Sequence, residues 1–129
     1  MTQNQSRFVS YNANPDKNRV GDCTVRAIAT ALNQSWEETF VGMCVYGLME
    51  YDMPSADFVW GEYLKSKGFE RELLRGRYTV KSFCEEYPYG TFLLAINGHL
   101  VVAIDGCYFD TWDSGNERPI YFWYRKEDL

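Results

Sequence analysis

Histidine is the scarcest chemically active residue in this chain, and its scarcity limits the chemistry that the chain can perform. His99 is the only histidine among 129 residues, so any reaction that needs an imidazole must use it. The four cysteines include no CxxC pair, whereas structural zinc sites normally take paired thiolates at that short spacing. We therefore expect no metal and no other cofactor, and no disulfides in a reducing compartment.

Two further features are missing, and each excludes a class of partner. Positive charge is not in excess, because 13 Lys and Arg stand against 18 Asp and Glu, a formal charge of −5. Phosphate backbones are bound mainly by basic residues, so nucleic acid is not an expected partner. No apolar run approaches the length of a membrane span, and the N-terminal segment contains no signal-peptide core. The sequence predicts a soluble, cytoplasmic protein without a membrane partner.

Aromatic side chains, in contrast, are abundant: eight Phe, four Trp and ten Tyr make up 17% of the residues. The apolar fraction of 46% is ordinary for a globular protein. A chain of this length usually forms one domain, so we predict a single domain over residues 1–129. The many rings predict either a core of large flat side chains or a cleft lined by them.

Helical patterns fill the first two-thirds of the chain. The predicted helices span 23–33, 35 to 46–49, 56–67 and 80–86. Asp22 occupies the N-cap position of the first helix, and Ser35 that of the second. Residues 1–20 are polar and rich in turn formers, which predicts a loop, and residues 70–78 are compatible with either a strand or a loop.

After Gly90 the pattern changes to short runs of β-branched and aromatic residues separated by turns. The predicted strands span 91–97, 99–104, 107–112 and 119–124. Asp105-Gly106, between two of these runs, is a strong signal for a two-residue hairpin loop. Helices followed by strands predict an α+β fold in which N-terminal helices pack on a C-terminal antiparallel meander.

One cysteine stands where a thiol is easily activated. Cys23 is predicted to lie at the N-terminus of the first helix, where free N–H groups and the helix dipole favour a thiolate. A nucleophilic thiol also needs a base, and His99, which begins a strand directly after Asn97-Gly98, is the only imidazole available. Such a pair needs a third group that orients the ring and stabilises its cation.

The hairpin geometry leaves two candidates for that third group. If Asp105-Gly106 is a two-residue loop, His99 lies opposite Trp112. Side chains alternate along a strand, so Asp110 and Trp112 then share a face with His99, and Asp110 is a diagonal neighbour within reach of its ring. A three-residue loop with a bulge would reverse the alternation and present Asp113 instead.

The motif GDCTVRAIA places a Cys at the head of an alanine-rich helix, and GHLVVAIDG and DTW follow much later in the chain. This order resembles the papain-like cysteine peptidase superfamily, whose pattern is G-x-C, then a His before a hydrophobic strand, then Asn-Ser-Trp. The chain is also similar to small papain-like proteins encoded by bacteriophages. The resemblance covers roughly residues 18–33 and 91–113, and it implies a minimal papain-like fold.

The resemblance implies a role for each site residue. The implied roles are Cys23 as nucleophile, His99 as general base and then acid, Asp110 as the orienting residue where the family commonly has Asn, and Trp112 as the ring that shields the His–acid hydrogen bond from water. The family's oxyanion-hole Gln corresponds here to Lys17. The neighbouring Asn18 could donate its amide N–H instead, alongside the backbone N–H of Cys23.

The expected function is hydrolysis of a peptide, isopeptide or other amide bond in a protein or peptide substrate, through a Cys–His–Asp triad and an acyl-thioester intermediate. Acyl transfer or deamidation by the same triad is an alternative, because the acceptor that enters the cleft decides between them. A second alternative is a non-catalytic papain-like fold that binds a protein partner.

The other three cysteines lack a basic neighbour in sequence and are expected to be inert.

Overall fold

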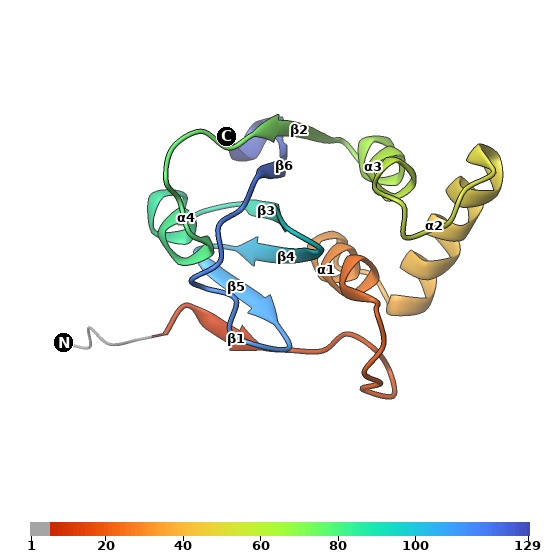
Figure 1. Cartoon of the computed structure of the whole chain (residues 1–129), viewed down its shortest axis with the longest axis horizontal. Helices are drawn as coiled ribbons and strands as arrows, with labels where there is room; N and C mark the ends of the chain where they lie inside the picture. The colour runs from red at the N-terminus through yellow and green to blue at the C-terminus, as the bar shows by residue number, and fades with distance from the viewer. Residues whose placement is uncertain (1–5) are drawn as a thin grey trace.

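A six-stranded mixed sheet forms the centre of the molecule in the computed structural model, which describes residues 6–129 (Figure 1). The strands lie in the order β1-β5-β4-β3-β6-β2. Their bounds are β1 (Phe8–Ser10), β2 (Phe69–Leu73), β3 (Thr91–Ile96), β4 (His99–Ile104), β5 (Cys107–Asp110) and β6 (Tyr121–Arg125). The α-helices are α1 (Cys23–Leu32), α2 (Trp36–Glu50), α3 (Asp57–Ser66) and α4 (Val80–Glu86), and a short 3₁₀ turn, η1 (Lys126–Asp128), follows β6.

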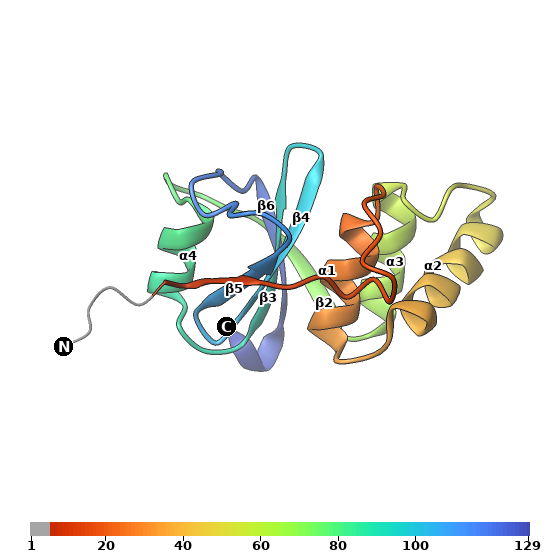
Figure 2. The same ribbon diagram turned by 90° about the horizontal axis from the view of Figure 1, so that it is seen from below.

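Both faces of the sheet are apolar, because helices cover both of them. Leu100 and Val102 of β4 belong to a core shared with α1, α2 and α3. Their neighbours Val101 and Ala103 belong to a second core shared with α4. Figure 2 shows α4 on one side of the sheet and α1 and α3 on the other, with α2 outermost. Burial on both faces explains why β3 and β4 read as continuous apolar runs instead of alternating ones.

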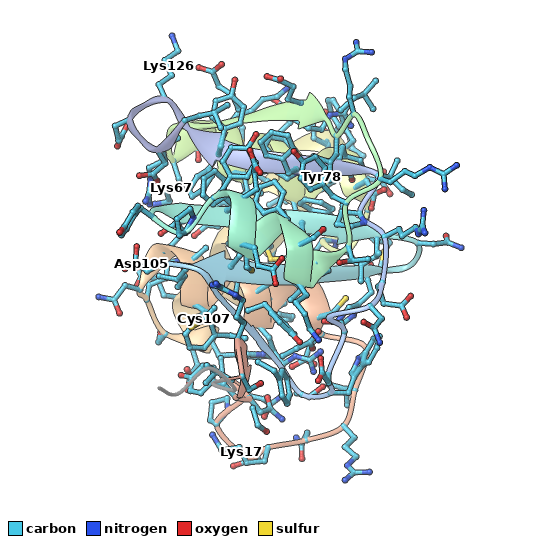
Figure 3. All side chains as sticks on the ribbon, turned by 90° about the vertical axis from the view of Figure 1, so that its left-hand side faces the viewer. Lys17, Lys67, Tyr78, Asp105, Cys107 and Lys126 are labelled. Atoms are coloured by element: carbon cyan, nitrogen blue, oxygen red, sulfur yellow. The ribbon has the colours of Figure 1, made fainter. Side chains whose placement is uncertain are left out.

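Capping side chains fix where the helices begin. The Ser35 hydroxyl accepts a hydrogen bond from the Glu38 N–H at 3.0 Å, which starts α2. Thr79 and Ser82 form a reciprocal capping box at the start of α4. Figure 3 looks onto α4, which covers the sheet through Val80, Phe83 and Cys84, all fully buried.

The predicted α+β class and the order of helices before strands are confirmed. All four predicted helices form, and the register of the hairpin at Asp105-Gly106 is as expected, with Ala103 opposite Tyr108. The undecided segment 70–78 divides into β2, which contributes an edge strand, and a loop that follows it.

The predicted antiparallel meander is wrong in two respects. Phe8–Ser10, expected within a loop over residues 1–20, form β1, which runs parallel to β5, so the sheet is mixed. Residues 1–5 of that expected loop lie outside the described residues. Second, β6 does not continue the meander beside β5 but crosses back to pair with β3 and β2. A further small difference is that β5 ends at Asp110, which leaves Trp112 in the loop after the strand.

In residues 6–129 we find no helix with the length and apolar character needed to cross a membrane.

Candidate active site

The proposed nucleophile comes from α1 and its partners from the sheet. Cys23 is the first residue of α1, and α1 packs directly on β4, which begins with His99. Close packing is possible because the buried face of α1 carries Ala27 and Ala31. Both catalytic candidates therefore lie at the ends of well-packed elements, where little of their position is left to flexible backbone.

His99 follows a tight turn at Asn97-Gly98. Gly98 has a φ of +72°, a left-handed conformation that costs glycine little. At the other end of β4, Asp105 and Gly106 have φ values of 49° and 81°, the pattern of a type I′ hairpin turn. This turn sets the register of β4 and β5 and thereby places Asp110 near His99.

The carboxylate of Asp110 lies 2.7 Å from Nε2 of His99, and both side chains are largely buried. Two further groups hold this carboxylate: the Thr111 N–H donates to Oδ1 and the Ser114 hydroxyl to Oδ2, each at 2.8 Å. Because Nε2 is engaged by Asp110, Nδ1 is the ring nitrogen left to exchange a proton with Cys23. Asp110 is therefore built to fix the orientation of the ring.

The alternative acid, Asp113, does not contact His99. Its carboxylate accepts hydrogen bonds from the Tyr108 hydroxyl and from the Gly115 N–H, and these contacts lower its pKa. Asp113 thus stabilises the loop after β5. The two-residue hairpin, and with it the choice of Asp110, agrees with the observed register.

Opposing pKa shifts couple Cys23 and His99. Partial burial alone would raise the pKa of the Cys23 thiol, but hydrogen bonding to His99 and to the Leu100 N–H, with the charges of His99 and Arg26, lowers it overall. Burial alone would lower the pKa of His99, but hydrogen bonds to Asp110 and Cys23 and their charges raise it to about 9. Both shifts favour the same proton distribution, in which His99 carries the proton and Cys23 is a thiolate.

Trp112 lies beside the proposed base. Its ring centroid is 5.1 Å from that of His99, with the planes tilted by 38°. Trp112 is 45% exposed, so one side of its ring meets solvent while the other covers the imidazole. This position suits the shielding role that the resemblance implies.

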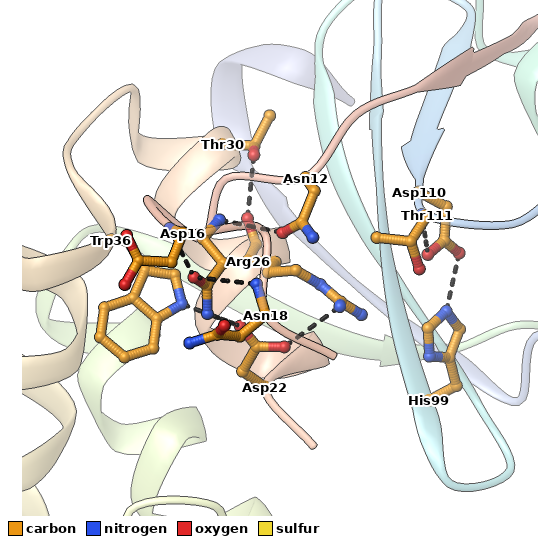
Figure 4. Close-up of polar contacts among 11 residues, drawn as sticks. Asn12, Asp16, Asn18, Asp22, Arg26, Thr30, Trp36, His99, Asp110 and Thr111 are labelled. Carbon is orange, nitrogen blue, oxygen red and sulfur yellow. Dashed lines mark hydrogen bonds and ion pairs between the residues drawn. The ribbon is translucent and has the colours of Figure 1, made fainter. Parts of the chain in front are cut away.

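Asp22 is the N-cap residue of α1, as predicted, but its side chain does not cap the helix. Its buried carboxylate instead accepts hydrogen bonds from Asn14 Nδ2 at 3.1 Å and Trp36 Nε1 at 3.0 Å, and pairs with Arg26 at 3.1 Å. Figure 4 shows this network on the α1 side and the His99–Asp110 pair on the sheet side. A carboxylate next to Cys23 would by itself disfavour a thiolate there, and the Arg26 charge compensates that of Asp22.

The buried Asn14 also organises the loop that contains the oxyanion-hole candidate. Its side-chain oxygen accepts hydrogen bonds from the Asp16 N–H at 3.0 Å and the Asn18 N–H at 3.4 Å. Asn18 itself is exposed and lies on the wall of the cleft that contains Cys23 and His99. No hydrogen bond to another residue in 6–129 orients the Asn18 side-chain amide, so Asn18 stays a prediction for the oxyanion hole.

An open cleft gives access to the Cys–His pair from two directions. One branch, of about 770 Å³, extends from Cys23 and His99 past Arg19 and Trp112. The other, of about 360 Å³, extends from the same two residues past Trp60 and Tyr121. These volumes are in the range of ligand sites, so an extended peptide ligand could lie across the Cys23 thiol with one residue in each branch.

The other cysteines are placed differently. All four cysteines are free thiols, and burial raises the pKa of Cys84 to about 12, which keeps that thiol protonated. Within residues 6–129 no group of three or more His, Cys, Asp or Glu side chains is arranged to hold a metal ion.

Comparison of the chain with protein-family models, curated proteins and solved structures returned no match. The papain-like resemblance therefore rests on the residues themselves.

Sequence reasoning did not assign the side chains that support the site. Ser114 was recognisable only as part of a turn, and its bond to Asp110 depends on how that loop closes. The Asp22 network joins the loop before α1, the start of α1 and the start of α2, and no sequence pattern pairs these positions. The only sequence pattern that indicates this network is Asp22 with Arg26 four residues later. That spacing predicts an ion pair but does not place it beside an active site.

Proposed function

We propose that this chain is a papain-like cysteine hydrolase that cleaves a peptide, isopeptide or other amide bond. One observation carries the proposal: in an open cleft, a thiol whose pKa is lowered faces an imidazole whose pKa is raised and whose far nitrogen is held by a buried carboxylate. Structural cysteines are usually protonated and isolated from bases, as Cys84 is. The combination supports a nucleophilic role for Cys23.

The proposed reaction begins with attack of the Cys23 thiolate on the carbonyl carbon, which moves the C=O electron pair onto oxygen. The backbone N–H of Cys23, in the first turn of α1, is one donor for this oxyanion, and the Asn18 amide is the proposed second. The His99 imidazolium then donates its Nδ1 proton to the leaving nitrogen as the C–N bond breaks. The products of this half-reaction are an amine and an acyl-thioester on Cys23.

Water completes the cycle. Neutral His99 takes a proton from water as the oxygen attacks the thioester carbonyl, the C–S bond breaks, and a carboxylic acid leaves. The thiolate and imidazolium are restored. Throughout, Asp110 accepts a hydrogen bond from Nε2–H of His99 and stabilises the ring when it is cationic.

Selective alkylation tests the nucleophile. At pH 6 a thiol with the ordinary pKa of 9.0 is ionised to about one part in a thousand, so iodoacetamide should label Cys23 far faster than the other cysteines. Cys23→Ala should abolish this rapid labelling, while the matched variant Cys44→Ala should retain it. Rapid labelling that survives Cys23→Ala would place the nucleophile elsewhere.

Product analysis tests the reaction. The untagged chain is incubated with internally quenched peptides and with an added amine, with Cys23→Ala as the blank. Release of carboxylic acids that depends on Cys23 supports hydrolysis. Transfer of the acyl group to the amine, or release of ammonia from glutamine peptides, would favour acyl transfer or deamidation. Tight peptide binding without any product would indicate the non-catalytic alternative.

A further inference from the structure

The two branches of the cleft differ in the charge of their lining residues. They share the residues at their junction: Gly21, Cys23, Gly98 and His99. From that junction one branch is lined by cationic and polar side chains, whereas the other has no cation of its own in the described part of the chain and combines polar residues with several large apolar ones. A substrate lying across Cys23 therefore meets a different surface on each side of the bond that is attacked.

The larger branch is cationic in an acidic protein. Lys17, Arg19 and Arg26 line it, and no Asp or Glu does, although acidic residues outnumber basic ones in the chain by 18 to 13. Figure 3 places Lys17 at the end of the molecule opposite to Lys126, on the loop before α1. Lys17 Nζ donates to the Asn12 carbonyl at 2.8 Å, which holds the lysine against this loop.

The three cations are not equally available to a ligand. Arg26 is 15% exposed and shares its charge with Asp22 at 3.1 Å. Arg19 is exposed and forms no ion pair with any residue in 6–129. Arg19 is thus the group best able to bind an anion in this branch, and a guanidinium suits a carboxylate because it can donate two parallel hydrogen bonds.

The smaller branch is walled by large apolar side chains. Trp60, Ile96, Ile120 and Tyr121 line it, and among residues 6–129 Asp57 is its only charged residue apart from the shared Cys23–His99 pair. Ile120 is aliphatic, yet 53% of it is exposed to solvent in this branch. Covering such a surface with an apolar side chain of the substrate would remove it from water, which is favourable.

From these two linings we propose that the substrate carries an anionic group, such as an Asp or Glu side chain, on the Arg19 side of the scissile bond and a bulky apolar residue on the Tyr121 side. This inference rests on the proposed function, because it describes the substrate of the same Cys23 site. The cationic branch selects the charge, and the apolar branch selects size and hydrophobicity.

Charge selection can be measured without turnover. Two probes, chloroacetyl-glutamate amide and chloroacetyl-glutamine amide, alkylate Cys23 and differ only in charge. We expect wild-type Cys23 to react about three to five times faster with the glutamate probe, which is the size of effect that one exposed ion pair produces. The preference should shrink as salt is raised from about 10 mM to about 1 M, because screening weakens exposed pairs.

A pair of charge-reversed variants separates Arg19 from the general charge of the protein. Arg19→Glu should abolish or invert the preference for the glutamate probe. Arg75→Glu makes the same change in net charge at an exposed site outside both branches, and should retain the preference. Both variants keep the Cys23–His99 pair, so the attraction of the imidazolium for anions cancels in the comparison.

The apolar branch has its own test. Chloroacetyl-phenylalanine amide should label Cys23 faster than chloroacetyl-alanine amide, and Ile120→Ser should reduce the difference at least twofold. Leu48→Ser, which changes an even more exposed aliphatic residue on α2 outside the cleft, should leave it unchanged.

The outcomes distinguish this inference from the proposed function. If Cys23 reacts selectively but Arg19→Glu and Ile120→Ser leave the probe ratios unchanged, the substrate inference is overturned and the nucleophile assignment stands. If Cys23 shows no selective reactivity with any probe, the proposed function fails. Probe ratios that shift as expected in a chain that hydrolyses no peptide would support the substrate inference and overturn hydrolysis.

Discussion

The single histidine makes one prediction unusually direct, because every imidazole signal in a nuclear magnetic resonance spectrum of the untagged chain belongs to His99. The His99 pKa should lie near 9, well above the ordinary value of 6.5. That difference corresponds to about 3 kcal/mol in favour of the imidazolium, at about 1.4 kcal/mol for each tenfold change in the proton equilibrium. Asp110 and Cys23 together supply this stabilisation and overcome the opposing effect of burial.

Replacing Asp110 with Asn tests how much of that stabilisation the carboxylate supplies. The Asn side chain keeps a hydrogen-bond acceptor near Nε2 but lacks the negative charge. Charge-assisted hydrogen bonds are about twice as strong as neutral ones, so we expect the His99 pKa to fall to about 7–8 in Asp110→Asn. Cys23→Ser should also lower it, because a hydroxyl does not supply the charge of a thiolate.

The assay is a titration of the His99 ring signals between about pH 5 and pH 10, in the wild type and the three variants Asp110→Asn, Cys23→Ser and Asp113→Asn. Asp113→Asn is the matched control, since Asp113 contacts Tyr108 and Gly115 and not the imidazole. A wild-type pKa near 6.5 would refute the reasoning. So would a pKa that responds to Asp113→Asn and not to Asp110→Asn.

Three further predictions concern stability. The variant Asp22→Ala removes the buried acceptor that Arg26, Asn14 and Trp36 share, so its free energy of unfolding in urea should fall by about 3–5 kcal/mol. The control Glu62→Ala breaks an exposed pair with Lys65 and should lower the free energy of unfolding by under about 1 kcal/mol. Because the folded-state pKa of His99 is raised, the stabilising contribution of His99 is fully present below about pH 6.5 and is lost as the pH rises through about 9. The difference in unfolding free energy between the wild type and Asp110→Asn should therefore shrink between these two pH values. A difference that grows over the same range would contradict this prediction. Ala27→Leu should overpack the contact between α1 and β4, cost about 1–3 kcal/mol in urea unfolding and slow the alkylation of Cys23, while Ala56→Leu, in the turn before α3, should do neither.

The parts of the fold that the sequence predicted are those set by local chemistry. Helix α4 begins at Thr79 because that side chain and Ser82 cap each other, and both residues lie within one turn. The β4–β5 register follows from Asp105-Gly106, because a type I′ turn leaves one way to pair the flanking strands. That register makes Asp110 a candidate partner of His99 from the sequence alone.

The parts that the sequence did not predict depend on distant partners. Strand β1 has only three residues, and its partner β5 lies about a hundred residues later in the chain, so no local pattern distinguishes it from a loop. Strand β6 has a clear β pattern, but nothing in it specifies pairing with β3 and β2 in place of β5. Ser114 and Asn14 were missed for another reason: their partners Asp110 and Asp22 are near in sequence, but the contacts depend on how each loop closes.

The aromatic excess belongs mainly to the framework that positions the site, and only in part to the cleft. Phe83 and Phe92 build the core beneath α4, and Trp60 packs against Trp123 in the core beneath α3. These rings cover both faces of the sheet, and a sheet packed on both sides resists displacement of its strands. Because Cys23 belongs to the helical layer and His99 to the sheet, their distance is fixed by how tightly α1 lies on β4. The large rings hold the layers, and the small alanines of α1 let the thiol reach the imidazole.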